Sequence, residues 1–177
     1  MTATRNYPEV VLRVLEDLRE YMHRFYPERE KNAPFPLEFW RIEDEDLFFE
    51  ALSYLPLQMP VTNVIDLSPF PEGFRLAFPI FWLEDDYQFN GWTALTNAGE
   101  WLLPTAIAAY ERIGMHSEAQ ALRAALDSCR ADPDDSEAAE NAYKSVPNDF
   151  SDEEVKNESL ISFFRKNAHL FEIPERV

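Results

Sequence analysis

Apolar side chains recur at the spacing of an amphipathic helix along most of this chain, and that spacing constrains the fold more than any other feature. Between residues 8 and 25 they share one helical face, at Val11, Val14, Leu15, Leu18, Tyr21, Met22 and Phe25. Similar patterns predict helices over residues 43–55, 78–89, 99–113, 117–130 and 136–144 and after Ser151. We therefore expect a mainly α fold, a compact single domain of about six to seven helices spanning residues 1–177.

Residues 56–79 are harder to assign because prolines interrupt them at Pro56, Pro60, Pro69, Pro71 and Pro79. That density disfavours a helix, and residues 61–67 and 74–78 fit short strands. A small β-hairpin around residues 61–78 is therefore compatible with the sequence. Residues 78–89 fit either a buried helix or a strand, and we favour the helix.

Two local signals mark helix ends in the C-terminal half. Gly114 follows the apolar pattern of residues 99–113 and is well placed to end that helix. Ser151 and Glu154 have the spacing of a capping box, which predicts that the last helix begins there.

The charge is large and unevenly distributed. The chain has 33 acidic and 16 basic side chains, a formal net charge of −17. Residues 42–111 contain 12 acids and one base, Arg75, and residues 131–164 contain 10 acids against Lys144 and Lys156. Such a field repels nucleic acid and anionic membranes and attracts basic surfaces. We expect a basic protein partner, with no direct nucleic acid contact and no membrane contact.

The acids gather in clusters that are candidate partner contacts. On a helix, acids three or four positions apart lie about 5–6 Å from each other and present a row of negative charges, as a phosphate backbone does. The candidates are Glu43, Asp44, Glu45, Asp46, Glu50, Glu84, Asp85, Asp86, Asp132, Asp134, Asp135 and Glu137.

Familiar catalytic and ligand-binding motifs are missing from the sequence. The three histidines are far apart, and the four glycines form no phosphate-binding loop. Residues 132–143 resemble a calcium loop, but Glu137 stands where the loop needs glycine and Tyr143 where it needs glutamate. We expect no catalytic residue, no cofactor and no metal site. The single cysteine, Cys129, and the lack of a secretory signal or a long apolar run favour a cytoplasmic location.

Three segments carry a resemblance to a known family: residues 90–99 (NGWTALTNAG), residues 107–126 with a break at Arg112–Met115, and the tail from Phe150 to Phe171. Together they resemble the DNA-mimic protein (DMP) family of small acidic bacterial proteins. The resemblance implies an all-α fold and, as for a characterised member, binding to a transcription factor in place of DNA. It also implies that Asn90, Gly91 and Trp92 form a structural turn, in which Gly91 can take a positive φ.

The leading hypothesis is an acidic protein that occupies the DNA-binding surface of a basic protein, such as a transcription factor, and inhibits it. An immunity protein that neutralises a basic nuclease toxin is an alternative of the same binding class. A hydrolase with an unrecognised carboxylate pair and an acidic domain without mimicry also stay open. The sequence does not distinguish a monomer from a dimer.

Overall fold

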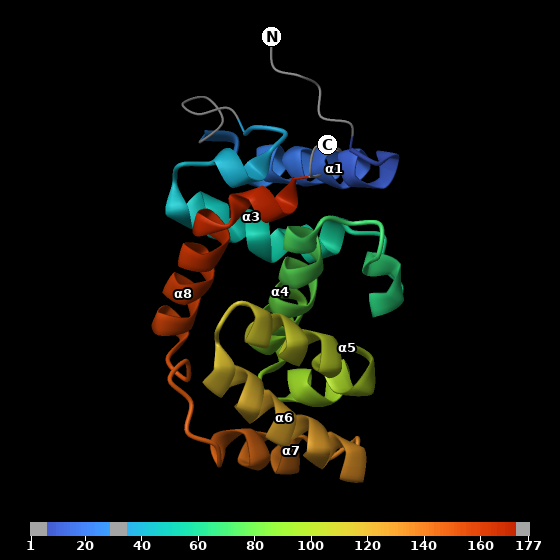
Figure 1. The fold of residues 1–177 in the computed structure, drawn as a ribbon, viewed down its shortest axis with the longest axis vertical. Coiled ribbons are helices and arrows are strands. Elements are labelled where there is room, and N and C mark those ends of the chain that lie inside the picture. Colours follow the sequence, from blue (N-terminus) through green and yellow to red (C-terminus); the bar gives the residue numbers. More distant parts are fainter. Residues whose placement is uncertain (1–6, 29–34, 173–177) are drawn as a thin grey trace.

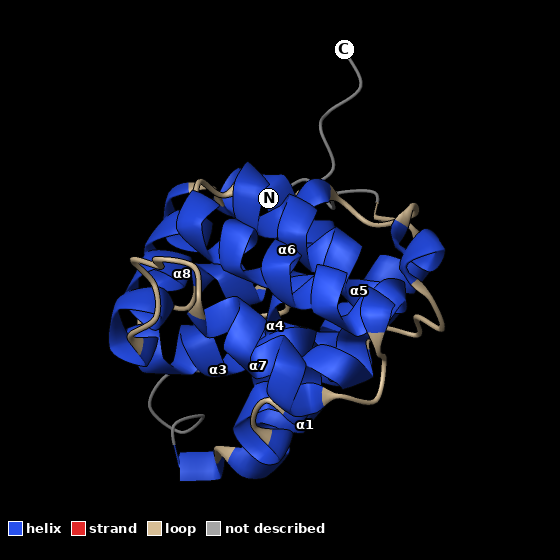
Figure 2. Ribbon diagram, turned by 90° about the horizontal axis from the view of Figure 1, so that it is seen from below, coloured by secondary structure: helices blue, strands red, loops and turns tan. Residues whose placement is uncertain are grey.

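The computed structural model describes residues 7–28 and 35–172, and within these ranges it contains seven α-helices and no strand (Figures 1 and 2). The α-helices are α1 (Glu9–Phe25), α3 (Glu45–Gln58), α4 (Glu72–Asn90), α5 (Thr93–Arg112), α6 (His116–Ala131), α7 (Ser136–Lys144) and α8 (Glu153–Lys166). Three 3₁₀ segments complete them: η1 (Phe39–Arg41), η2 (Val64–Leu67) and η3 (Ala168–Phe171). The mainly α prediction is confirmed.

The helices form an elongated stack with α4 at its centre. Helices α1 and α3 lie at one end, and α6 and α7 lie at the other, while α4 runs between them (Figure 1). Helix α8 returns along the side of the molecule and brings η3 back against α4. No helix among the described residues is both long enough and apolar enough to cross a membrane.

The small β-hairpin considered for residues 61–78 is wrong. Residues 64–67 form η2, where the Asp66 carboxylate accepts hydrogen bonds from the backbone N–H groups of Thr62 (3.2 Å) and Asn63 (3.3 Å). Residues 74–78 belong to α4, which begins directly after Pro71. Side chains from Phe74 to Phe81 are almost all buried, so this run lacks the one-sided pattern that separates a helix from a strand.

Helix α5 starts earlier than the predicted residue 99 because two helical pieces meet there. Gly99 has φ 35° and ψ −143°, which interrupts the helix between the turn at Gly91 and the long piece that ends at Arg112. Gly114 follows with φ 89°. Only glycine adopts such angles without steric cost, so these positions separate the helical pieces.

The last helix begins one residue later than the predicted capping box implies. The Asp152 carboxylate accepts hydrogen bonds from the N–H groups of Glu154 (2.9 Å) and Val155 (3.2 Å), so Asp152 rather than Ser151 is the cap. An aspartate caps as effectively as a serine, and its charge also interacts favourably with the helix dipole.

An aromatic cluster fastens η3 to α4. Phe171 in η3 stacks on Trp40 with a centroid separation of 5.6 Å and also meets Phe74 at 5.4 Å. Gly73 lies beneath it, where a Cβ atom would come within 2.7 Å of the Phe171 ring. The absence of a side chain at Gly73 therefore allows η3 to approach α4 closely.

Candidate functional site

Acids from α3 and α4 come together on one part of the surface. Burial raises the pKa of Asp85, and the negative charges of Asp86 and Glu50 raise it further. Glu50 also interacts with Tyr26, whose pKa is raised by burial and by a hydrogen bond with that carboxylate. Glu50 and Asp86 thus each lie near Asp85, although 35 residues separate Glu50 from Asp85 in the sequence.

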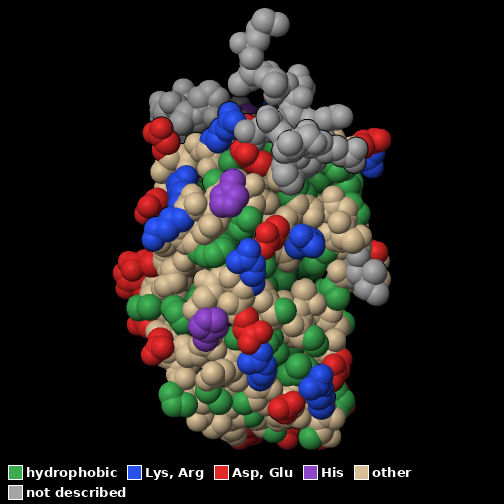
Figure 3. Space-filling model, viewed as in Figure 1, with side chains coloured by type: hydrophobic (Ala, Val, Ile, Leu, Met, Phe, Trp, Pro, Cys, Tyr) green, Lys and Arg blue, Asp and Glu red, His purple; other side chains and the backbone are tan. Residues whose placement is uncertain are grey.

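Arginines neutralise most of the other acids around α4 and α5. Glu72 pairs with Arg112, with Oε1 and Nε 2.8 Å apart, while Glu111 pairs with Arg123 and Glu100 with Arg130. The face in Figure 3 accordingly shows acidic and basic side chains interspersed. By contrast, Asp46, Glu50, Asp85 and Asp86 form no ion pair within the described part of the chain. We call these four residues the acidic row.

The acids just before α3 have partly structural roles. The Asp44 side chain caps α3 by accepting a hydrogen bond from the Leu47 N–H (2.9 Å). Arg165 donates hydrogen bonds to the carbonyls of Ile42 and Glu43 and places its guanidinium 4.2 Å from the centroid of the Phe48 ring. Glu43, Asp44 and Glu45 therefore lie close to a positive charge, whereas Asp46 is exposed and lies one helical turn before Glu50.

The cluster at residues 132–137 is not part of the same surface. It occupies the connection from α6 to α7 and the first turn of α7, at the opposite end of the molecule from α3 (Figure 1). Asp135 caps α7 by accepting from the Ala138 N–H (2.9 Å), and Asp132 accepts from the Asp134 N–H (3.2 Å). Asp134 and Glu137 are exposed there.

Asp86 also holds the turn between α4 and α5. Its carboxylate accepts hydrogen bonds from the side-chain amides of Asn90 (2.6 Å) and Asn97 (3.0 Å). Gly91 has φ 56° and ψ −139° and ends α4, and Trp92 precedes the first residue of α5. The Asp86 carboxylate therefore connects the end of α4 to α5 across the turn at Asn90, Gly91 and Trp92.

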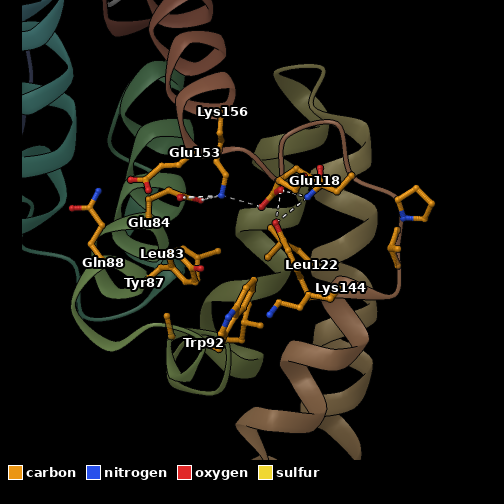
Figure 4. A pocket seen from close by; sticks show the side chains of 17 residues that line it. Leu83, Glu84, Tyr87, Gln88, Trp92, Glu118, Leu122, Lys144, Glu153 and Lys156 are labelled. Atoms are coloured by element: carbon orange, nitrogen blue, oxygen red, sulfur yellow. Dashed lines mark hydrogen bonds and ion pairs between the residues drawn. The ribbon is translucent and has the colours of Figure 1, made fainter.

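Glu84 points away from its acidic neighbours and into the interior. Its carboxylate forms an ion pair with Lys156 of α8 (3.0 Å) and accepts a hydrogen bond from the Tyr110 hydroxyl (2.5 Å). Lys156 also lies 3.6 Å from Glu118 of α6, so one ammonium group stands between two carboxylates (Figure 4). Glu84 is consequently engaged inside the molecule rather than presented at the surface.

Glu118 is almost completely buried, with 1% of its surface exposed, yet it has a full set of partners. It accepts hydrogen bonds from the Tyr143 hydroxyl (2.7 Å) and the Asn148 amide (2.5 Å). Burial raises the pKa of Glu118, and the charge of Lys156 opposes that rise. For Lys156, burial alone lowers the pKa, but the charges of Glu84 and Glu118 outweigh it and raise the pKa overall.

Glu84, Glu118 and Lys156, which we call the buried cluster, form one wall of a cavity of about 490 Å³. The rest of the lining includes three aromatic rings, from Tyr87, Trp92 and Tyr143. Lys144 extends across Trp92, with Nζ 4.9 Å from the ring centroid (Figure 4). No group of three or more histidine, cysteine, aspartate or glutamate side chains within the described residues is arranged to hold a metal ion. The cavity therefore combines apolar rings with charged groups.

Sequence reasoning did not identify Glu118, Lys156 or the aromatic rings as a site. Lys156 is one of only two bases among residues 131–164, which is the one signal that could have singled it out.

A protein-family model described as "DMP19-like protein" matches residues 68–167, more than half of the chain. The chain belongs to the DMP19-like family. Comparison with curated proteins and with solved structures found no match. The DMP19-like segment runs from just before α4 to the end of α8, so it includes the buried cluster, the cavity, Asp85 and Asp86. Asp46 and Glu50 lie on α3, outside that segment.

Proposed function

We propose that this protein binds a basic, DNA-binding protein through its acidic surface and occupies the site that DNA would use. The observation that carries the proposal is the acidic row of Asp46, Glu50, Asp85 and Asp86, which forms no ion pair with any basic side chain that the structure describes. A DNA-binding surface presents lysines and arginines to phosphates, and a row of carboxylates offers them comparable contacts.

The energetics of the row favour a role in binding over a role in folding. Burial raises the pKa of Asp85, and repulsion from the like charges of Asp86 and Glu50 raises it further. Elsewhere on α4 and on α5, arginines neutralise the carboxylates of Glu72, Glu100 and Glu111. A basic partner would supply the missing positive charge at the acidic row.

Membership of the DMP19-like family supports the same function, because the family is named for DNA mimicry. The protein would then act as a competitive inhibitor of its partner, and a transcription factor is the target class we favour. The acidic row replaces the broader set of sequence candidates as the proposed contact surface, since Glu84 is internal and residues 132–137 lie at the other end.

The test compares two charge reversals that change the net charge equally. Asp46→Lys/Asp85→Lys changes the acidic row, and Asp134→Lys/Glu137→Lys makes the same charge change at the far end. Asp46 and Glu137 are each the second residue of a helix, so both pairs lose one favourable contact with a helix dipole.

Each variant is immobilised and used to capture proteins from a lysate of the native host, followed by elution with increasing salt. We expect the wild type and the Asp134/Glu137 variant to retain a DNA-binding protein that salt releases. The Asp46/Asp85 variant should lose it while keeping its helical circular dichroism. Equal retention by both variants would contradict the proposed surface.

A further inference from the structure

The cavity beside the buried cluster has the composition of a site for a cationic side chain. Trp92 contributes one wall, and its ring lies 5.0 Å from the Tyr87 ring and 5.1 Å from the Tyr143 ring, measured between centroids. The faces of aromatic rings carry negative electrostatic potential and attract cations, and tryptophan does so most strongly.

A cation of the protein itself already occupies this ring. Lys144 Nζ lies 4.9 Å from the centroid of Trp92, and its ammonium group also pairs with Glu140 on the outer side. The Lys144 side chain is 55% exposed, so moving it into solvent disturbs little packing. Lys144 thus shows what kind of group the ring accepts and can give way to another.

The charge of the lining also favours a cation. The lining contains three carboxylates, from Glu84, Glu118 and Glu153, and two ammonium groups, from Lys144 and Lys156. If Lys144 moves out, the lining is left with two more negative than positive groups. Glu153 is exposed at the first turn of α8 and forms no hydrogen bond or ion pair through its carboxylate with any residue that the structure describes. It can therefore accept hydrogen bonds from an incoming group.

We propose that the cavity lined by Trp92, Lys144 and Glu153 binds an arginine side chain of the basic partner, in place of Lys144. This inference rests on the proposed function and adds a specific anchor to it. A guanidinium group is planar, so it can stack on Trp92 where the Lys144 ammonium now lies and donate its N–H groups to Glu140, the carboxylate that Lys144 reaches from there. A buried arginine in an aromatic pocket is also a typical hot spot of protein interfaces.

The direct test uses the intact protein and Nα-acetyl-L-arginine amide, with binding followed by Trp fluorescence and by two-dimensional NMR. The citrulline analogue has nearly the same shape without the charge and serves as the control ligand. We expect the arginine compound to bind at least about fivefold more tightly, as one cation–π contact implies. Equal affinities for the two compounds would overturn the proposal.

Two pairs of variants locate the binding. Glu140→Gln should weaken binding of the arginine compound by about threefold or more, while Glu137→Gln, the same change one turn earlier on α7, should have little effect. Lys144→Met should tighten binding, because it removes the competing cation, and Lys166→Met at the far end of α8 should not. The side chains at all four positions reach solvent, so we expect the four variants to fold. Identical effects within either pair would place the compound outside the cavity.

The result of this binding experiment can be told apart from the result of the capture experiment that tests the proposed function. If the arginine compound binds as expected but the protein captures no DNA-binding protein, the arginine site is supported and the proposed DNA mimicry is contradicted. If the DNA-binding protein is captured but the arginine and citrulline compounds bind alike, the mimicry stands and the arginine anchor fails.

Discussion

Lys156 Nζ lies 3.0 Å from a carboxylate oxygen of Glu84 and 3.6 Å from one of Glu118, so a single ammonium group joins α8 to both α4 and α6. These three side chains are at most 14% exposed. Two carboxylates at such a depth repel each other strongly without a cation between them. The position of α8, and with it the wall of the cavity, therefore depends on Lys156.

Replacing Lys156 with methionine should destabilise the protein substantially. The variant keeps the length of the side chain but leaves Glu84 and Glu118 buried without a positive partner, which typically costs about 3–5 kcal/mol. Urea unfolding followed by circular dichroism measures the loss, and Lys166→Met, an exposed lysine on the same helix, is the control. A loss below about 1 kcal/mol would show that the carboxylates find other partners.

Stability should fall at alkaline pH, and the buried cluster should be the cause. Burial and the charge of Glu84 raise the pKa of Tyr110, burial and the charge of Glu118 raise that of Tyr143, and the pKa of Lys156 is also raised. A group with a raised pKa contributes its stability fully below its unfolded pKa, here about 10 for these groups, and loses it as pH rises further. Urea midpoints at pH 8, 10 and 11 measure the fall. Tyr143→Phe should be less stable at pH 8 but less sensitive to the rise; an unchanged pH dependence would exclude Tyr143 as a contributor.

Asp85→Asn should stabilise the fold while weakening partner binding. Because the pKa of Asp85 is raised by burial, Asp86 and Glu50, its ionised form is unfavourable in the folded state. Removing a like-charge contact on a helix surface typically gains about 0.2–0.5 kcal/mol. The gain should be present at pH 7 and disappear as pH falls through the folded pKa of Asp85, where the carboxyl is already neutral. Thermal unfolding at pH 7 and at acidic pH checks this, and a destabilised variant at pH 7 would contradict it.

Gly91→Ala should destabilise the turn between α4 and α5. Gly91 has φ 56° and ψ −139°, a combination that residues with a Cβ atom adopt only at a cost of about 1–3 kcal/mol. No atom crowds the position, so the effect isolates backbone strain. Thr93→Ala, two residues away and exposed, is the control for the neighbouring sequence. Equal stability of the two variants would show that the turn relaxes without cost.

Helices with a one-sided apolar face were predictable from the sequence, and the residue range of α7 was predicted without error. Residues 74–78 were not, because Pro79, which disfavoured a helix in the sequence, lies inside α4, and a run that is buried at almost every position has no periodicity to separate a helix from a strand. The uneven distribution of charge was also evident from the sequence, but the sequence did not show which acids are neutralised by ion pairs. Glu84 and Asp85 are adjacent in the chain. Glu84 points into the interior because it pairs with Lys156, which is 72 residues away in the sequence.

The most direct test of the central claim is competition between this protein and DNA for one captured partner. A labelled duplex carrying the partner's own binding sequence is titrated with the protein, and fluorescence anisotropy reports the DNA that stays bound. The account predicts that wild-type protein displaces the DNA completely and that Asp46→Lys/Asp85→Lys does not. A ternary complex of protein, partner and DNA, or equal displacement by the charge-reversed variant, would contradict it.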